Sequence, residues 1–157
     1  MSTKPMVVIV DDEEMVVTSL KALLELEDEF EVSGFTDPAA AENFWASNPV
    51  ALVISDYRMP GINGLDLLKR LKAVRPEASR ILLTSHADAN SAIAAINEVG
   101  LFQYLEKPWD NEQLLLATRS GVERSLLLRG LREKVEQLDS AHLTLKNAQR
   151  RLIHAFL

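Results

Sequence analysis

The sequence predicts an α/β fold in which a parallel β-sheet carries helices on both faces. Five short apolar runs alternate strictly with helical patterns, and two of the runs are apolar at nearly every position. Strands buried on both faces have this composition, and strict alternation is typical of βαβ units. The 157 residues, 47% of them hydrophobic, suffice for one such domain and a short appendage. We therefore expect a (βα)5 doubly wound sheet of five parallel strands with a long C-terminal helical extension.

The first half of the chain contains three predicted strands, short and apolar, at residues 6–10, 31–35 and 51–55. Between them, apolar residues recur at helical spacing over 15–26 and 38–47. Asp37 and Pro38 mark the start of the second helix, because aspartate caps helices and proline suits their first position. Glu13 and Glu14 are expected in the first turn of the first helix, where negative charge favours the helix dipole.

The second half continues the alternation with strands predicted at residues 80–84 and 102–105. Helices are predicted at residues 65–74, at residues 88–99 and from about Asp110 onward. Gly100 ends the second of these helices. The loop before residue 65 is rich in turn residues, and Gly64 is expected to permit a tight turn there.

Charge and composition exclude several classes of protein. The chain has 17 basic and 23 acidic residues, but the stretch from Val122 onward has a net charge of +3, which leaves −9 on the first 121 residues. An acidic domain is a poor partner for nucleic acid, and the mixed charges of the tail are typical of a solvated helix face. The chain has no cysteine and no apolar run long enough to cross a bilayer. We expect a cytoplasmic protein without membrane association or direct nucleic-acid binding.

Polar side chains stand where the predicted strands end. Asp11 and Asp12 follow the first strand, Asp56 follows the third, Thr84 ends the fourth and Lys107 follows the fifth. Polar residues often terminate strands, which explains any one of these residues but not the whole set. Ligands of such sheets bind at the carboxyl ends of the strands, so these five side chains are expected to form one site.

The chemistry of this set is coherent. Three clustered carboxylates repel one another unless a cation neutralises them, and oxygen ligands favour a hard ion such as Mg²⁺. Aspartate can act as a nucleophile toward a phosphoryl group and form an acyl phosphate. The Thr84 hydroxyl and the Lys107 ammonium can contact the remaining phosphoryl oxygens.

Four stretches together resemble the receiver domain of two-component response regulators. They are Val7-Val8-Ile9-Val10-Asp11-Asp12-Glu13, Ile54-Ser55-Asp56-Tyr57-Arg58-Met59-Pro60-Gly61-Ile62-Asn63-Gly64, Ile81-Leu82-Leu83-Thr84-Ser85 and Tyr104-Leu105-Glu106-Lys107-Pro108. The resemblance covers roughly residues 4 to 122 and implies a flavodoxin-like receiver fold. It implies a receiver domain at residues 1–122 and a helical coiled-coil linker at residues 123–157.

The resemblance implies a role for each site residue. Asp56 resembles the aspartate that accepts a phosphoryl group from a histidine kinase or phosphotransfer protein. Asp12 resembles the direct metal ligand, Asp11 a carboxylate acting through metal-bound water, and the Arg58 backbone carbonyl a further ligand of Mg²⁺. Thr84 and Tyr104 resemble the switch residues, Lys107 the lysine that pairs with Asp56, and Pro108 a proline that is commonly cis.

The family also implies that such a domain is not a conventional enzyme, because it catalyses only its own phosphorylation and slow dephosphorylation. Arg58 and His86 occupy positions that flank the phosphorylation site in this family and can tune hydrolysis of the acyl phosphate. Two other functions stay open. A haloacid-dehalogenase-like phosphatase also forms an aspartyl phosphate, although it carries a second aspartate where this chain has Arg58. A constitutive coiled-coil adaptor is the other alternative.

The C-terminal stretch shows a heptad pattern over about four heptads. Leucines recur every seven residues from Leu131 to Leu152, and Leu128, Val135, His142, Gln149 and Phe156 fall at the partner positions. This pattern predicts a parallel coiled coil that makes a homodimer, with folding back on the domain or fraying as alternatives. This stretch resembles a signalling linker from a longer regulator. Lys107-Pro108-Trp109 and the surrounding residues 97–110 resemble receivers linked to transcriptional-activator or HD-type cyclic-dinucleotide phosphodiesterase outputs.

Overall fold

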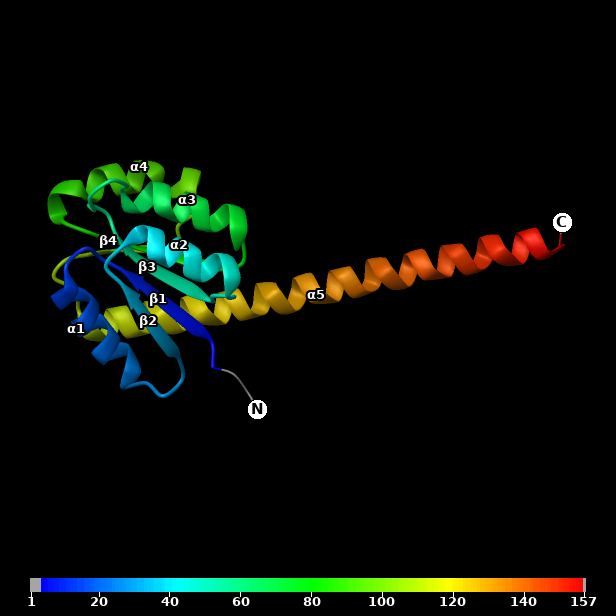
Figure 1. The fold of residues 1–157 in the computed structure, drawn as a ribbon, viewed down its shortest axis with the longest axis horizontal. Coiled ribbons are helices and arrows are strands. Elements are labelled where there is room, and N and C mark those ends of the chain that lie inside the picture. The colour runs from blue at the N-terminus through cyan, green and yellow to red at the C-terminus, as the bar shows by residue number, and fades with distance from the viewer. Residues whose placement is uncertain (1–3, 157) are drawn as a thin grey trace. The chain divides into compact units, whose positions relative to one another are not determined.

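The computed structural model describes residues 4–156, apart from the side chains at positions 95 and 156. Strands and helices alternate along the chain (Figure 1). The strands are β1 (Met6–Val10), β2 (Glu31–Phe35), β3 (Leu52–Asp56), β4 (Ser79–Thr84) and β5 (Gln103–Glu106). The helices are α1 (Glu14–Glu25), α2 (Pro38–Ser47), α3 (Gly64–Val74), α4 (Ala89–Val99) and α5 (Asn111–Phe156), with a 3₁₀ turn, η1, at His86–Asp88.

All five strands are parallel and lie in the order β2-β1-β3-β4-β5. β1 pairs with both β2 and β3, so the strand order reverses between β1 and β3. The connections that follow β1 and β3 therefore run in opposite directions across the sheet. The loops at the ends of these two strands diverge, and a crevice lies between them. The predicted doubly wound, flavodoxin-like fold is confirmed.

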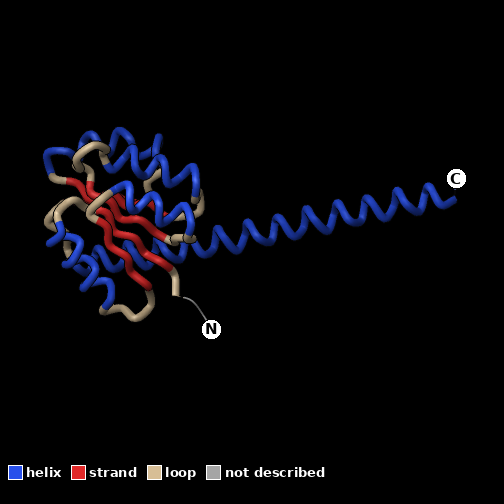
Figure 2. Tube along the Cα trace, viewed as in Figure 1, coloured by secondary structure: helices blue, strands red, loops and turns tan. Residues whose placement is uncertain are grey.

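Each face of the sheet has its own apolar core, because successive side chains of a strand point to opposite faces. On one face, Val7 and Ile9 of β1 pack with buried residues of α1 and α5. On the other face, Val8 and Val10 pack with buried residues of α2, α3 and α4. Figure 2 shows the resulting layers, with the red strands between blue helices. This burial on both faces explains the continuous apolar runs of the sequence.

Local signals set the helix ends where the sequence indicated them, within a residue or two. The Asp37 side chain accepts a hydrogen bond from the backbone N–H of Ala39 and caps α2. Gly100 ends α4 with a φ of 70°, in the left-handed region that glycine enters at little cost. The helix expected from Asp88 begins instead at Ala89, since residues 86–88 form the η1 turn.

The chain divides into two compact units, residues 1–125 and 126–157, and the described part of the second consists of α5 residues. Within the described residues, no helix combines the length and the apolar character that crossing a membrane requires.

Candidate functional site

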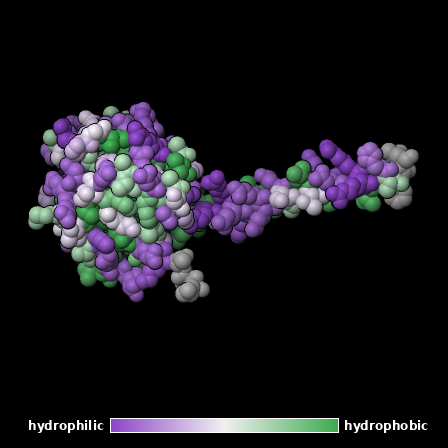
Figure 3. Space-filling view, viewed as in Figure 1, coloured by the Kyte–Doolittle hydropathy of each residue, from purple (hydrophilic) through white to green (hydrophobic). Residues whose placement is uncertain are grey.

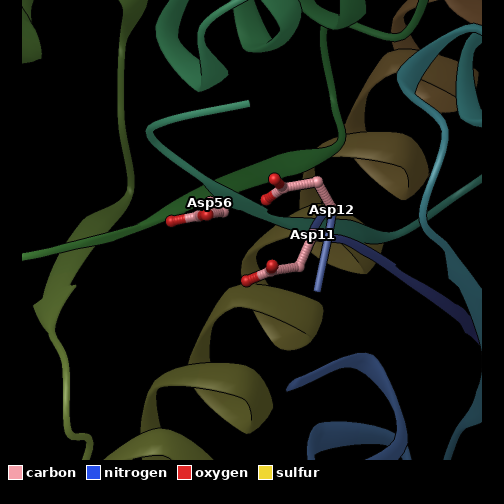
Figure 4. Close-up of side chains that lie close together, drawn as sticks. All are labelled: Asp11, Asp12 and Asp56. Atoms are coloured by element: carbon pink, nitrogen blue, oxygen red, sulfur yellow. The ribbon is translucent and has the colours of Figure 1, made fainter. Parts of the chain in front are cut away.

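Three carboxylates meet at the carboxyl ends of β1 and β3. Asp11 and Asp12 directly follow β1, and Asp56 is the last residue of β3. One carboxylate oxygen from each lies within 4.8 Å of the others, and Figure 4 shows the three side chains gathered beside one another. The switch point of the sheet brings them together, because β1 and β3 are neighbours although 45 residues separate Asp11 from Asp56 in the chain.

The Lys107 ammonium lies between two of these carboxylates. Its Nζ is 3.0 Å from Asp11 Oδ2 and 3.1 Å from Asp56 Oδ1. Asp11 is fully buried and Asp56 is 8% exposed. The sequence predicted the pairing of Lys107 with Asp56, but the structure adds Asp11 as an equally close partner.

Burial and neighbouring charge shift the ionisation of this cluster. Burial, followed by repulsion from the Asp11 carboxylate, raises the pKa of Asp56 above its usual value, although Lys107 and the Tyr57 N–H act in the opposite direction. Burial alone would lower the pKa of Lys107, but its contacts with Asp11 and Asp56 outweigh burial and raise it. Lys107 is therefore held as a cation beside carboxylates that repel one another.

The oxygens of Asp56 and Asp11 are held unequally. Asp56 Oδ1 accepts a hydrogen bond of 2.9 Å from the backbone N–H of Tyr57 besides its contact with Lys107. No residue in the described range 4–156 donates a hydrogen bond to Asp56 Oδ2. Asp11 Oδ1 accepts from the N–H of Glu13, which fixes Asp11 against the start of α1.

Asp12 is exposed and lines an open hollow of about 510 Å³ together with residues of the β3–α3 loop. The lining residues are Asp12, Tyr57, Arg58, Met59, Pro60 and Asn63. Of the three carboxylates, Asp12 is the one that lines this hollow.

The β3–α3 loop folds back tightly on the end of β3. The N–H of Gly64 donates to the carbonyl of Tyr57 at 2.7 Å, which closes the loop. A Cβ atom at Gly64 would lie 2.1 Å from the backbone oxygen of Asp56, so only glycine fits. The expected reason for Gly64 was a tight turn. The left-handed residue of that turn is Gly61, with a φ of 85°, while Gly64 is required by the close approach.

Thr84 and Tyr104 lie on the neighbouring strands β4 and β5. Thr84 is fully buried, and its hydroxyl donates to the carbonyl of Ser85 at 3.2 Å rather than to Asp56. Tyr104 is partly buried and packs against the core formed with α2, α3 and α4. The bond between Lys107 and Pro108 is cis, as the sequence resemblance implied.

The side chain of Arg58 has a partner that the sequence analysis missed. Its Nε and Nη2 lie 2.6 and 2.8 Å from the two carboxylate oxygens of Asp88, 30 residues away. Asp88 is buried and also accepts a hydrogen bond from Ser85. The hydrogen bond from Arg58 lowers the pKa of Asp88. The sequence does indicate that Arg58 and Asp88 both follow strands and so lie at the carboxyl edge of the sheet. No rule of sequence spacing, however, predicts that these two residues form a pair.

His86 is exposed, and its Nδ1 lies 3.2 Å from a carboxylate oxygen of Glu106. Trp109 packs against the core on the α1 and α5 face and lies within hydrogen-bond distance of Asn111. Neither residue touches the three carboxylates, so His86 lies at the rim of the site and Trp109 supports the start of α5.

Comparison with known proteins identifies the family. Residues 7–119 match the family model of the response regulator receiver domain. The chain is 33% identical over 133 residues to the hydrogenase transcriptional regulatory protein HoxA of Cupriavidus necator, and the match covers 85% of this chain and 26% of HoxA. It is 32% identical over 125 residues to the transcriptional regulatory protein FixJ of Bradyrhizobium diazoefficiens, with 80% of this chain and 60% of FixJ covered.

Solved structures give the same result. The signal receiver domain of an HD domain-containing protein from Pseudomonas fluorescens superposes with a TM-score of 0.76 at 35% identity, covering 83% of this chain and 95% of that one. A response regulator receiver domain protein from Clostridium thermocellum gives a TM-score of 0.73 at 32% identity, with 79% and 98% covered. The chain spans less than two thirds of the length of these curated regulators. On this evidence the chain belongs to the response regulator receiver domain family of two-component signalling.

Proposed function

We propose that residues 1–122 accept a phosphoryl group on Asp56 from the phosphohistidine of a sensor histidine kinase or phosphotransfer protein. We further propose that residues 123–157 are a helical linker that passes the signal on. The observation that carries the proposal is the position of Asp56, a buried carboxylate at a strand end beside Asp11, Asp12 and Lys107.

In the proposed reaction, Asp56 Oδ2 attacks phosphorus. The new O–P bond forms as the P–N bond to the donor imidazole breaks, and the departing nitrogen keeps the electron pair and takes a proton from solvent. Lys107, whose Nζ is 3.1 Å from Asp56 Oδ1 and 3.0 Å from Asp11 Oδ2, would contact a phosphoryl oxygen and balance the charge left on Asp11. The donor would approach from the side of the exposed Asp12, which lines an open hollow.

The carboxylate cluster fits a hard divalent ion, since three carboxylate oxygens within 4.8 Å of one another are the donors that Mg²⁺ prefers. We propose that Asp12, Asp56 and the Arg58 backbone carbonyl would hold Mg²⁺ directly and that Asp11 would act through a metal-bound water. The ion would neutralise the negative charge that gathers when a phosphoryl group meets this cluster.

We propose that Thr84 and Tyr104 change position when a phosphoryl group is present on Asp56. In the unmodified protein the Thr84 hydroxyl is bonded to its own loop at Ser85. A phosphoryl group on Asp56 offers a stronger, charged acceptor, so Thr84 would turn toward it and vacate space into which the partly buried Tyr104 ring can move. The surface near β4 and β5 would change as a result, which controls dimerisation or a downstream output.

We propose that the second unit makes a parallel coiled-coil homodimer. Heptad positions Leu131, Val135, Leu138, Leu145 and Leu152 are between 47% and 69% exposed in the described chain. Figure 3 shows green, hydrophobic side chains along this part of α5 among purple, hydrophilic ones. A second copy of the helix covers such a stripe, because each copy presents the same a and d positions. The heptad position at Phe156 lies outside the described side chains.

A phosphodonor assay tests the central proposal. The protein is incubated with acetyl phosphate and Mg²⁺, and covalent phosphate is followed by intact-protein mass. Wild type should gain one phosphoryl group, Asp56→Asn should gain none, and Asp66→Asn, which alters an exposed aspartate in the first turn of α3, should behave as wild type. No labelling of wild type, or equal labelling of Asp56→Asn, would refute the proposal.

The same assay separates the receiver from a phosphatase. A haloacid-dehalogenase-like enzyme needs a carboxylate where this chain has Arg58, and the Arg58 side chain is engaged with Asp88. We therefore expect slow loss of the phosphoryl group from Asp56 and no repeated turnover of the phosphodonor.

A further inference from the structure

The two loops that flank the phosphoryl site are tied together by one ion pair. Arg58 follows Asp56 by two residues in the β3–α3 loop, and Asp88 lies in η1, which follows Thr84 of β4. The two nitrogen–oxygen distances of 2.6 and 2.8 Å make a two-point contact between the guanidinium and the carboxylate. Such a contact fixes orientation as well as distance, which a lysine cannot do.

The carboxylate of this pair depends on its partners. The Asp88 side chain is only 9% exposed, whereas that of Arg58 is 78% exposed. Asp88 is stabilised as an anion by Arg58 first and then by the Ser85 hydroxyl, and its pKa is lowered accordingly. Losing Arg58 would leave a buried carboxylate without its cation, which is costly. The segment from Ser85 to Asp88 is therefore held in place while Arg58 stays bound.

This held segment adjoins the Thr84 hydroxyl. Thr84 donates to the carbonyl of Ser85, and the hydroxyl of the same Ser85 donates to Asp88, so Ser85 contacts both Thr84 and the ion pair. Turning the Thr84 hydroxyl toward Asp56 breaks the first of these bonds.

We propose that Asp88 is a positioning residue that holds the Arg58 guanidinium away from Asp56, and that a phosphoryl group on Asp56 competes with Asp88 for this guanidinium. The phosphoryl group carries up to about two negative charges against one on Asp88, and Arg58 is attached two residues from it. Its arrival weakens the pair between Arg58 and Asp88. This inference rests on the proposed phosphorylation of Asp56.

Competition and a purely structural role predict different results for the two halves of the pair. Asp88→Asn removes the competing anion and leaves Arg58 available, so binding of a phosphoryl mimic should tighten. Arg58→Ala removes the cation that the mimic would gain and leaves the Asp88 anion nearby, so binding should weaken. If the pair only braces the loops, both substitutions break the same brace and should change affinity in the same direction.

The test is a titration with beryllofluoride in the presence of Mg²⁺, followed by tryptophan fluorescence, to which Trp109 contributes two residues after Lys107. The full chain is used throughout. We expect Asp88→Asn to bind beryllofluoride about fivefold more tightly than wild type. This factor is at the lower end of the range for coupled binding sites, because the ion pair is partly exposed. We expect affinity about threefold weaker for Arg58→Ala, as for the loss of one partly exposed charge contact.

A matched control and a milder variant guard against misfolding. Glu98→Gln breaks the exposed Lys69–Glu98 pair, which also links α3 to α4, and should leave affinity unchanged. Arg58→Lys alters an exposed side chain, keeps the positive charge and loses the two-point contact, so it should bind at least as tightly as wild type. Circular dichroism melts establish that each variant is folded.

Two results would overturn the inference: a change of the same sign in Asp88→Asn and Arg58→Ala, or binding by Arg58→Lys as weak as that of Arg58→Ala. If wild type takes up a phosphoryl group on Asp56 but the variants fail this pattern, only the competition is wrong. If wild type neither takes up phosphate nor binds beryllofluoride, both the proposed function and the competition are wrong.

Discussion

At the scale of single residues, Asp56 combines two properties that oppose each other. Its carboxylate is buried beside the Asp11 carboxylate, which makes the ionised form unfavourable, while Lys107 and the Tyr57 N–H reduce that penalty without cancelling it. A raised pKa means that the folded protein disfavours the anion relative to the unfolded chain. The group that the proposed chemistry needs therefore costs stability in the metal-free protein.

A first prediction follows for Asp56→Asn without Mg²⁺. Asparagine keeps the size of the side chain and removes the charge, and Lys107 keeps Asp11 as its partner. The melting temperature at pH 7 should rise by about 3 °C, as expected for a gain near 1 kcal/mol in a domain of this size. Differential scanning calorimetry measures the change.

The stability gained by Asp56→Asn should depend on pH in one direction. Because the folded-state pKa of Asp56 lies above the ordinary 3.8, the destabilisation is absent below pH 3.8 and complete above the raised folded value. The advantage of Asp56→Asn should thus shrink as the pH is lowered toward 3.8. A gain that persists unchanged in acid would show that repulsion and burial of the charge are not its cause.

At the scale of elements, two glycines of α5 meet different surroundings. A Cβ at Gly121 would lie 2.4 Å from Leu52 Cδ1 and 3.3 Å from Ser79 Cβ, so α5 can approach the sheet only with glycine here. The carbonyl of Gly121 also accepts a hydrogen bond from the Ser79 hydroxyl. At Gly130 a Cβ would meet nothing within 4 Å. The same residue type therefore serves packing at one position and has no packing role at the other.

We predict opposite effects for alanine at these two positions. Gly121→Ala should destabilise the protein by about 2 kcal/mol, because Leu52 is fully buried and has no room to move. Gly130→Ala should make its segment of helix more stable by about 1 kcal/mol, since alanine restricts the unfolded chain and meets no obstacle. Urea unfolding measures the first effect, and helix content on heating measures the second. Destabilisation by both variants would contradict the packing argument.

At the scale of the whole molecule, the proposed homodimer has a recognisable charge pattern. With Val135 and His142 at a positions, Lys134 is a g residue and Asp139 the e residue of the next heptad. In a parallel, in-register dimer these two positions face each other across the interface. Symmetry creates the Lys134–Asp139 contact twice.

A charge exchange tests this arrangement. Lys134→Glu or Asp139→Lys alone places like charges opposite each other and should weaken dimerisation about tenfold, since two exposed pairs are reversed. The double variant Lys134→Glu/Asp139→Lys restores opposite charges and should regain the wild-type dissociation constant in analytical ultracentrifugation. Failure of the double variant to recover would exclude the parallel register, and a monomeric wild type would exclude the dimer itself.

Much of the fold can be predicted from the sequence, because the patterns that determine it are local or repeat periodically along the chain. Runs such as residues 6–10 and 51–55 are apolar at nearly every position, and only burial on both faces of a sheet suits them. Once the strands are assigned, Asp11, Asp12 and Asp56 are expected to lie together, because the carboxyl ends of parallel strands meet at one edge of the sheet. The composition of the candidate site was predictable for this reason.

The pairings inside the site were not predictable in the same way. Whether Lys107 contacts one carboxylate or two, and whether Gly64 serves a turn or a close approach, depends on distances of a few ångströms between separate loops.

The sequence alone determined which functional residues stand at the strand ends: an acidic pair after the first strand, an aspartate after the third, a threonine at the end of the fourth and a lysine after the fifth, followed by a helix with a heptad pattern. Tertiary structure decided that Arg58 pairs with Asp88 and that Thr84 is bonded within its own loop. Periodicity fixes which face of an element is buried, but contacts between loops depend on how the sheet and helices pack. The Arg58–Asp88 pair, 30 residues apart in the chain, exists only once that packing is complete.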